Sequence, residues 1–233
     1  MTGTAVETFD LPQGAAQVQW RRSARARRIS LRIDPRSGSV VVTLPLRAAR
    51  AAGMALLIDH AAWIADRLSA LPRSISFADG VSVPVDGAPH RIRHVPGERG
   101  GAWLAGAEIR VSGEADFLPR RVADLLRREA RQRLGALAAT KAEAAGVRPS
   151  RVAVKDTSSR WGSCAPDRTV MFCWRLVMAP VFVQDYVAAH EVAHLRHMNH
   201  GRRFWALVSE LTPHTDTGIA WLRHEGTGLL RIG

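Results

Sequence analysis

The pattern of apolar and polar positions predicts short β-strands in the first half of the chain. Two β-rich runs lie at residues 27–34 and 39–45, joined by a turn-like stretch of Asp, Pro, Ser and Gly. Shorter runs at 81–85, 90–95 and 108–113 are broken by Gly and Pro. They predict a small meander of further strands.

One helix is predicted within this half, from about Arg47 to Leu71. Its apolar residues recur at helical spacing, and Pro72 follows as a stop signal. The first half therefore reads as β-rich with a single helix.

The second half has helical periodicity. A long amphipathic helix is predicted from Pro119 to Ala145, with Gly146 as its C-terminal cap. Two strands should follow at 151–155 and 169–174, joined by a loop at 156–168. Three helices should come next, at 180–197, 201–211 and 217–224. The order predicts an α+β chain, with a β-rich region at 1–115 and a mostly helical region with a small sheet at 116–233.

Composition indicates a globular protein. The chain has 233 residues, 46% of them hydrophobic, which is enough to bury a core without disulfides. Two cysteines, Cys164 and Cys173, favour a reducing compartment. The N-terminus does not resemble a secretory signal, and no apolar run reaches about 18 residues. We therefore expect a cytoplasmic protein with no membrane contact.

The charge balance is strongly basic, with 33 Lys and Arg against 21 Asp and Glu. Such a surface attracts polyanions, so nucleic acid is a candidate partner. The basic residues nearest the N-terminus are Arg21, Arg22, Arg25, Arg27 and Arg28. All but two of the basic residues are Arg, however, and coding bias with a solvated surface would give the same composition.

The strongest chemical signal is His190-Glu191-Val192-Ala193-His194, an H-E-x-x-H pattern in a helical context. Residues four apart lie on one helix face, so both imidazoles can bind one ion. Glu191 can then take a proton from a metal-bound water. Imidazole ligands with an open position for water suit Zn²⁺. Two half-buried histidines without a metal, or a closed structural zinc site, are the alternatives.

His200, six residues after His194, is the favoured third ligand. The turn that brings it back could be made by Asn199, because Asn tolerates the left-handed conformation. Glu210 and His197 are the competing ligands. Three histidines stacked on one helix span roughly 10 Å, too far for one ion, so His197 should face substrate or solvent instead.

Several separate segments resemble the YgjP-like metallopeptidase family, which is related in its zinc core to SprT-like proteins. They are Ser159–Cys164, Trp174–Leu176, Asp185–Val187, the H-E-x-x-H motif, and Asn199-His200 with Phe204-Trp205. The resemblance is most specific over 151–211. One departure is Cys173, where a typical member has Asn before Trp-Arg.

The resemblance implies a zincin-like catalytic region at 116–233 with zinc on His190, His194 and His200 and with Glu191 as base. It implies a hydrolase, usually a peptidase, although nucleoside-triphosphate pyrophosphatase activity is also attributed to the family. A DNA-associated protease is a third reading, suggested by the SprT relationship and the basic surface. The substrate is thus a peptide or a nucleotide.

Substrate contacts are expected from Arg160, Trp161, Arg175 and His197. Arginine can bind a carboxylate or phosphate, or stabilise an oxyanion. The alternative is a buried ion pair, or stacking of an arginine on Trp161 or Trp174. The strand at 169–174 is a candidate edge for pairing with an extended peptide. An open edge would favour peptide, and an arginine-lined pocket would favour nucleotide.

Overall fold

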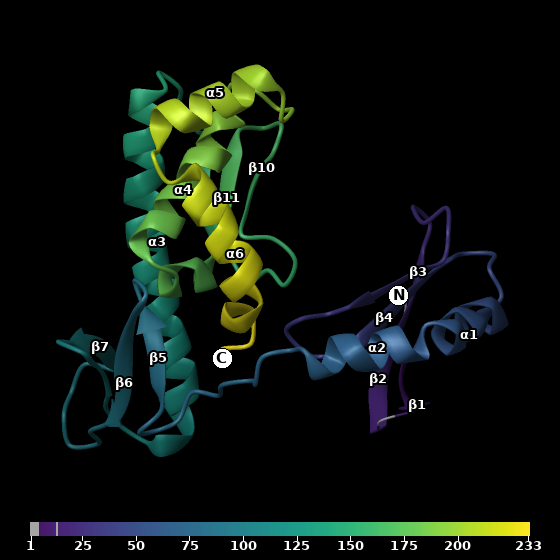
Figure 1. The fold of residues 1–233 in the computed structure, drawn as a ribbon. Coiled ribbons are helices and arrows are strands. Elements are labelled where there is room, and N and C mark those ends of the chain that lie inside the picture. The colour runs from purple at the N-terminus through teal and green to yellow at the C-terminus, as the bar shows by residue number, and fades with distance from the viewer. Residues whose placement is uncertain (1–4, 13) are drawn as a thin grey trace. The chain divides into compact units, whose positions relative to one another are not determined.

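The computed structural model describes residues 5–12 and 14–233 and contains two compact units, Met1–Arg73 and Ser74–Gly233 (Figure 1). Strands dominate the N-terminal part and helices the C-terminal part, which confirms the α+β class.

The sequence pattern placed the boundary between the β-rich and the mostly helical region at 115/116. The division into units falls earlier because the sheet of residues 82–111 packs its apolar face, including Ile92 and Ile109, into the same core as the long helix that follows.

The first unit is a four-stranded sheet with helices on one face. The strand order is β1-β2-β4-β3, with β2 and β4 parallel and both outer strands antiparallel to their neighbours. Val18, Trp20, Val42 and Leu57 are among the residues of its core. The elements are β1 (Ala5–Leu11), β2 (Gly14–Ser23), β3 (Ser30–Ile33), β4 (Val40–Pro45), α1 (Arg50–Asp59) and α2 (Ala61–Ser69).

The prediction of a single helix from Arg47 to Leu71 is wrong, because the segment forms two helices, α1 and α2. His60 separates them with a non-helical backbone, φ −110° and ψ 13°. The apolar spacing continues across the break, with Leu57 and Ile64 both fully buried in the same core. Periodicity alone therefore did not reveal the break.

The second unit is built around α3 (Leu118–Ala144). Its buried face runs from Leu118 to Ala142 along the whole helix, and Gly146 follows it in the left-handed conformation, φ +61°, as predicted for a cap. A four-stranded sheet in the order β5-β6-β8-β7 shares its core. These strands are β5 (Ser82–Val85), β6 (Ala88–His94), β7 (Ala102–Ala105) and β8 (Glu108–Val111).

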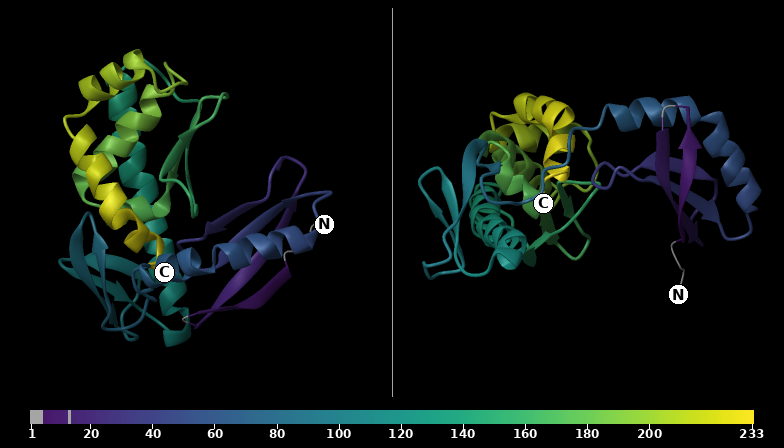
Figure 2. Two further views of the ribbon diagram at one scale, coloured as in Figure 1. Left: turned by 45° about the vertical axis from the view of Figure 1, so that its right-hand side comes forward. Right: turned by 90° about the horizontal axis from the view of Figure 1, so that it is seen from below.

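A second, three-stranded sheet and three helices complete the unit. The sheet has the order β10-β11-β9 and lies beside α4, while α6 lies on the other side of that helix (Figure 2). The elements are β9 (Arg151–Lys155), β10 (Gly162–Cys164), β11 (Thr169–Cys173), α4 (Val181–Ala193), α5 (Arg202–Leu211) and α6 (Thr215–Leu230). Short 3₁₀ turns lie at Ala115–Phe117 and Trp174–Met178.

The expectation of an edge strand at 169–174 is wrong. β11 is the central strand, parallel to β9 on one side and antiparallel to β10 on the other. Val170 to Cys173 are correspondingly buried. The edge is β10, inside the segment that the sequence pattern assigned to a loop.

Among the helices of the described residues, none combines the length and apolarity that a membrane crossing requires.

Helices α4 and α6 pack closely enough to require glycine at one contact. A Cβ on Gly218 would lie 2.7 Å from side-chain atoms of Tyr186. We expect Gly218→Ala to lower the free energy of unfolding by ~1–3 kcal/mol, because the helices must separate. Gly228→Ala is the matched control, since it lies on the same helix with nothing within 4 Å of the added methyl. It should raise stability by about 0.5–1 kcal/mol. Chemical denaturation distinguishes the two, and equal effects would contradict this packing.

Candidate active site

Helix α4 positions the central motif by being buried on nearly all sides. Ala188, Ala189, Val192 and Ala193 are fully inaccessible, because α3, α5, α6 and the small sheet surround the helix. Small side chains at these positions allow the close approach. His190 and Glu191 are therefore held by a helix whose rotation is fixed by packing.

Three imidazoles converge beside this helix. One ring nitrogen from each of His190, His194 and His200 lies within 4.8 Å of the other two. The Nε2 atoms of His190 and His200 are 3.2 Å apart. This is the only cluster of three or more potential metal ligands among the residues described. It unites the three positions predicted from the sequence.

The third histidine reaches the cluster because the helix stops early. α4 was predicted to continue to about His197, but it ends at Ala193 and His194 is its C-cap. The chain then turns, with the His197 N–H donating to the Ala193 carbonyl at 3.0 Å. Asn199 does not adopt the left-handed backbone expected of it. Among the described residues other than Gly, only Asp86 and Arg168 do.

The surroundings hold the imidazoles in orientations that leave nitrogens available to an ion. His194 Nδ1 is 3.1 Å from the His197 carbonyl oxygen, which favours a proton on Nδ1 and a free lone pair on Nε2. The buried Phe204 ring packs against all three, with centroid distances of 5.0, 4.6 and 4.7 Å to His190, His194 and His200. Burial, with smaller effects of the other two histidines, lowers the pKa of His190 to about 4. Burial likewise lowers the pKa of His194.

Neutral imidazole is the form that binds a metal ion, so these pKa shifts suit the role. Glu191 Oε2 also fits a bound ligand, because it is buried and has no hydrogen-bond partner within the described chain. A buried polar atom without a partner is rare in a native protein, and a catalytic role or a bound ion or water is a usual explanation. The donor set thus fits a divalent ion that accepts nitrogen ligands.

Glu191 is buried beside the histidines. Burial raises the pKa of its carboxyl to about 8, although Arg160 opposes the shift. Gly162 lies against this carboxyl so closely that a Cβ there would be 2.5 Å from Oε1. Glycine at 162 therefore leaves room for the Glu191 side chain.

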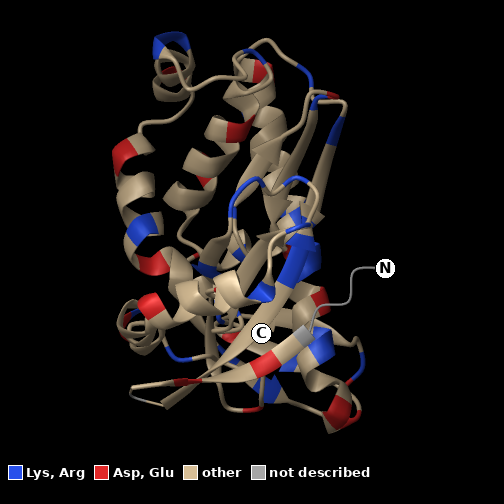
Figure 3. Ribbon diagram, turned by 90° about the vertical axis from the view of Figure 1, so that its right-hand side faces the viewer, with Lys and Arg blue, Asp and Glu red and all other residues tan. Residues whose placement is uncertain are grey.

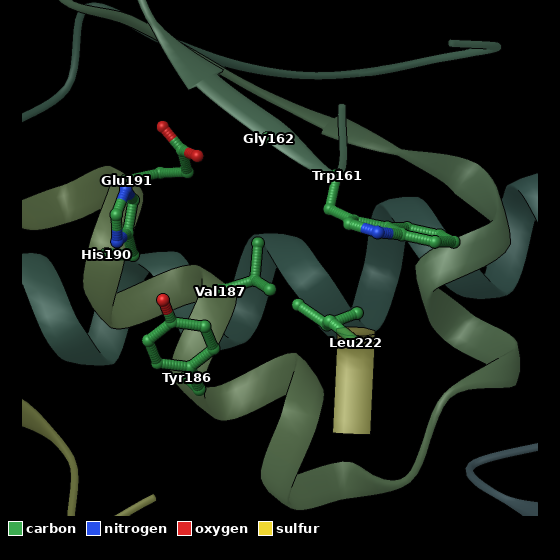
Figure 4. Close-up of a pocket in the computed structure, with 7 residues that line it drawn as sticks. All are labelled: Trp161, Gly162, Tyr186, Val187, His190, Glu191 and Leu222. Atoms are coloured by element: carbon green, nitrogen blue, oxygen red, sulfur yellow. The ribbon is translucent and has the colours of Figure 1, made fainter. Parts of the chain in front are cut away.

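Two adjoining cavities open on His190 and Glu191. The larger, of about 350 Å³, runs along β10 and is lined by Arg160, Gly162, Ser163, Cys164, Met198 and the three histidines with Glu191. The smaller, of about 150 Å³, is drawn in Figure 4 and is mostly apolar on the side away from Glu191. Its lining residues are Trp161, Gly162, Tyr186, Val187, His190, Glu191 and Leu222.

The predicted substrate-contact residues divide into two groups. Arg160 and Trp161 line the cavities. Arg175 does not, because its guanidinium is buried among other partners. It donates to the carbonyl oxygens of Ile232 and Gly233, pairs with Asp156 at 2.5 Å and stacks 4.3 Å from the Trp174 ring. The alternative of a buried, stacked ion pair thus describes Arg175.

His197 and Glu210 lie outside the cluster of three histidines. The contact of His197 with the site is through its backbone carbonyl, which faces His194. Tyr186, Val187 and Leu222 line the smaller cavity and were not identified from the sequence as site residues. Tyr186 and Val187 lie one turn before the motif on the same helix, and this spacing could have indicated that they line the site.

The chain matches a known protein family and, more distantly, a solved structure. Among solved structures, the chain is similar to the metallopeptidase zymogen of Pyrococcus abyssi abylysin, with 16% identity, a TM-score of 0.34, and coverage of 39% of this chain and 95% of that chain. No curated protein matches. The model of the YgjP-like family, metallopeptidase domain, matches residues 27–225, which include every residue of the candidate site. The chain belongs to the YgjP-like metallopeptidase family.

Proposed function

We propose that the protein is a zinc-dependent peptidase that binds its substrate as an extended strand along β10. The observation that carries this proposal is the position of β10. It is the edge of its sheet, and all three of its residues line the cavity that holds Glu191 and the three histidines. An edge strand beside a hydrolytic centre offers the backbone hydrogen bonds that a polypeptide needs.

Zinc is the ion that this donor set favours. His190, His194 and His200 would hold it with three neutral imidazole nitrogens and leave a position open, as catalytic zinc sites do. When bound, zinc would polarise the substrate carbonyl and lower the pKa of a water molecule. No carboxylate belongs to the cluster, which disfavours Mg²⁺ and Ca²⁺, since those ions prefer oxygen ligands.

Glu191 is the proposed proton carrier. Its carboxylate accepts a proton from the attacking water and then donates it to the amine nitrogen that leaves. The pKa of about 8 belongs to the metal-free site. A divalent charge nearby would favour the ionised carboxylate, so the base would be available at neutral pH. Arg160, which lines the same cavity, is positioned to bind a carbonyl or carboxylate of the substrate.

Strand polarity gives the substrate a direction. If the peptide pairs antiparallel with β10, its carboxyl half lies toward Gly162 and its amino half toward Cys164. The smaller cavity lies at the Gly162 end. It would then receive the side chain that follows the scissile bond. A cavity of about 150 Å³ holds a benzene-sized group, so a Leu or Phe side chain fits.

Nucleotide hydrolysis is the weaker alternative. A triphosphate would require several cationic groups at the site, as phosphate-binding sites generally provide. Arg160 lines the larger cavity, but Arg175 is committed to Asp156 and to backbone carbonyls. A DNA-associated protease remains a separate proposal that rests on the basic surface. Steep salt dependence of DNA binding would support it.

We expect the purified protein to bind about one zinc ion, the stoichiometry of a mononuclear site. His190→Ala, His194→Ala and His200→Ala should each bind far less. His197→Ala is the control, since only its backbone carbonyl faces the site, and it should retain the metal. Elemental analysis after dialysis measures the zinc content of each protein. Loss of zinc from the His197 variant, with retention of zinc by the His200 variant, would overturn the proposed ligand set.

Glu191→Gln should keep zinc and lose turnover of peptides by about 10²- to 10⁴-fold, the usual contribution of general acid–base catalysis. Casein, a peptide library and the four nucleoside triphosphates should be assayed side by side in both proteins. Peptide turnover that disappears in the variant is the expected result. Triphosphate turnover that disappears instead would reject the peptidase proposal in favour of a phosphohydrolase.

Leu222→Trp should fill the smaller cavity and change the substrate preference. Turnover of peptides with Leu or Phe after the scissile bond should fall roughly tenfold or more, whereas peptides with Gly or Ala there should be affected less. Leu222→Met preserves side-chain volume and is the matched control. A uniform loss across all peptides in the Trp variant would show that this cavity does not select the side chain.

A further inference from the structure

The first unit carries an open strand edge beside an apolar groove. β3 is the outer strand of its sheet and pairs with β4 alone. Between this edge and the two helices lies a groove of about 590 Å³. The groove is lined by Ile29, Ser30 and Leu31 from the strand side, by Leu56 and Trp63 from the helices, and by His60 between them.

The groove is suited to apolar side chains. Four of its six lining residues are apolar, and Trp63 is 41% exposed although its ring is large and mostly apolar. The same unit buries Trp20 to 7%, so the fold is able to bury a tryptophan where packing requires it. An exposed Trp at the wall of a groove is typical of a binding surface rather than of a core.

The backbone of β3 is available for pairing. Within the described residues, Ser30 to Ile33 make no backbone hydrogen bonds other than those to β4. The strand contains no proline or bulge, although it is short and carries Arg32, two other features by which natural edges limit pairing. Leu31 and Ile33 are half-buried, whereas Ser30 and Arg32 are exposed, as the alternation of side chains along a strand requires. Leu31 therefore faces the groove with its side chain, and Ser30 borders the groove at the edge of the strand. An added strand would place alternate side chains in the groove.

The edge is flanked by uncompensated positive charge. The first 73 residues contain eleven arginines and five acidic residues, and Figure 3 marks the charged residues on the ribbon. Arg25, Arg27 and Arg28 lie in the segment that leads directly into β3, and none of them forms an ion pair within the described chain. Arg32 is on the strand itself, 4.0 Å from Asp34. A ligand with acidic residues would complement this charge.

We infer that the β3 edge binds an extended, acidic polypeptide segment whose alternate side chains are apolar. The segment would add to the sheet as a fifth strand, its apolar side chains entering the groove beside Trp63 and its acidic ones facing the arginines. A second copy of the chain is disfavoured, because edge-to-edge pairing would bring two sets of arginines together. Single-stranded nucleic acid is disfavoured as the ligand. Sites that bind it stack successive bases on several aromatic rings, whereas Trp63 is the only Trp, Tyr or Phe among the residues that line this groove.

The test measures binding without turnover, so it is independent of the proposed peptidase activity. The full chain carrying Glu191→Gln is titrated against a fluorescein-labelled eight-residue peptide that alternates Glu with Val, and anisotropy is followed. Saturable binding is expected, with no binding of a peptide that alternates Lys with Val. Trp63→Ala should weaken binding by roughly tenfold or more, as loss of a central aromatic anchor does. Ile58→Ala is the control, since Ile58 is 60% exposed on α1 and does not line the groove.

Two N-methylated peptides test the backbone pairing directly. One is methylated on the amides of its odd residues and the other on those of its even residues. Only alternate N–H groups of a strand face its neighbour, so one peptide should lose binding and the other keep it. Equal effects of both methylations, or no effect of Trp63→Ala, would overturn the inference. So would tighter, Trp63-dependent binding of oligo(dT), or Trp63-dependent self-association seen by sedimentation without any peptide binding.

Discussion

The site depends above all on the burial of α4. This helix carries His190 and Glu191 and has His194 as its C-cap, and the apolar residues between them are enclosed by α3, α5, α6 and the small sheet. A helix that is apolar on almost every side cannot rotate without exposing part of its surface, which costs about 25 cal/mol per Å². The hydrophobic effect thus fixes the direction in which the polar side chains point. The orientation of His190 and Glu191 therefore depends on packing at Ala188 and Ala193.

The same enclosure determines the electrostatics of the site. Burial favours the uncharged forms of both kinds of group, lowering the pKa values of His190 and His194 and raising that of Glu191. Uncharged histidines are ready to bind an ion, while a carboxyl held away from water is strongly influenced by any charge that arrives. Arg160 and the sheet edge at β10 border the same space. The groups proposed for substrate recognition and for catalysis therefore all lie on one side of α4.

Much of this arrangement followed from local sequence signals. The spacing of His190 and His194 indicated one helix face, and the order of motifs indicated the family to which the chain belongs. The cap at Gly146 was predicted from its residue type, and the structure confirms it. These features depend on residues close together in the sequence, where propensity and periodicity carry the information.

Other features depend on contacts between distant residues and could not be predicted in this way. β10 has three residues, Gly, Ser and Cys, with no strand pattern, and it exists because β11 pairs with it. Arg175 has the sequence context of a site residue, but two of the carbonyls that it binds lie 57 and 58 residues further along the chain. The break at His60 is hidden because both flanking helices pack against one core. In each case tertiary contacts decided the outcome.

The early end of α4 has a consequence for the entropy of the chain. His190 lies in the helix and His194 caps its C-terminus, whereas His200 follows a short irregular segment. An ion held by all three would close a loop of a few residues, and short loops have a low entropic cost of closure. The segment around Asn199 would then lose freedom each time the ion binds and regain it on release. Local mobility in this short stretch would thus report on the occupancy of the whole centre.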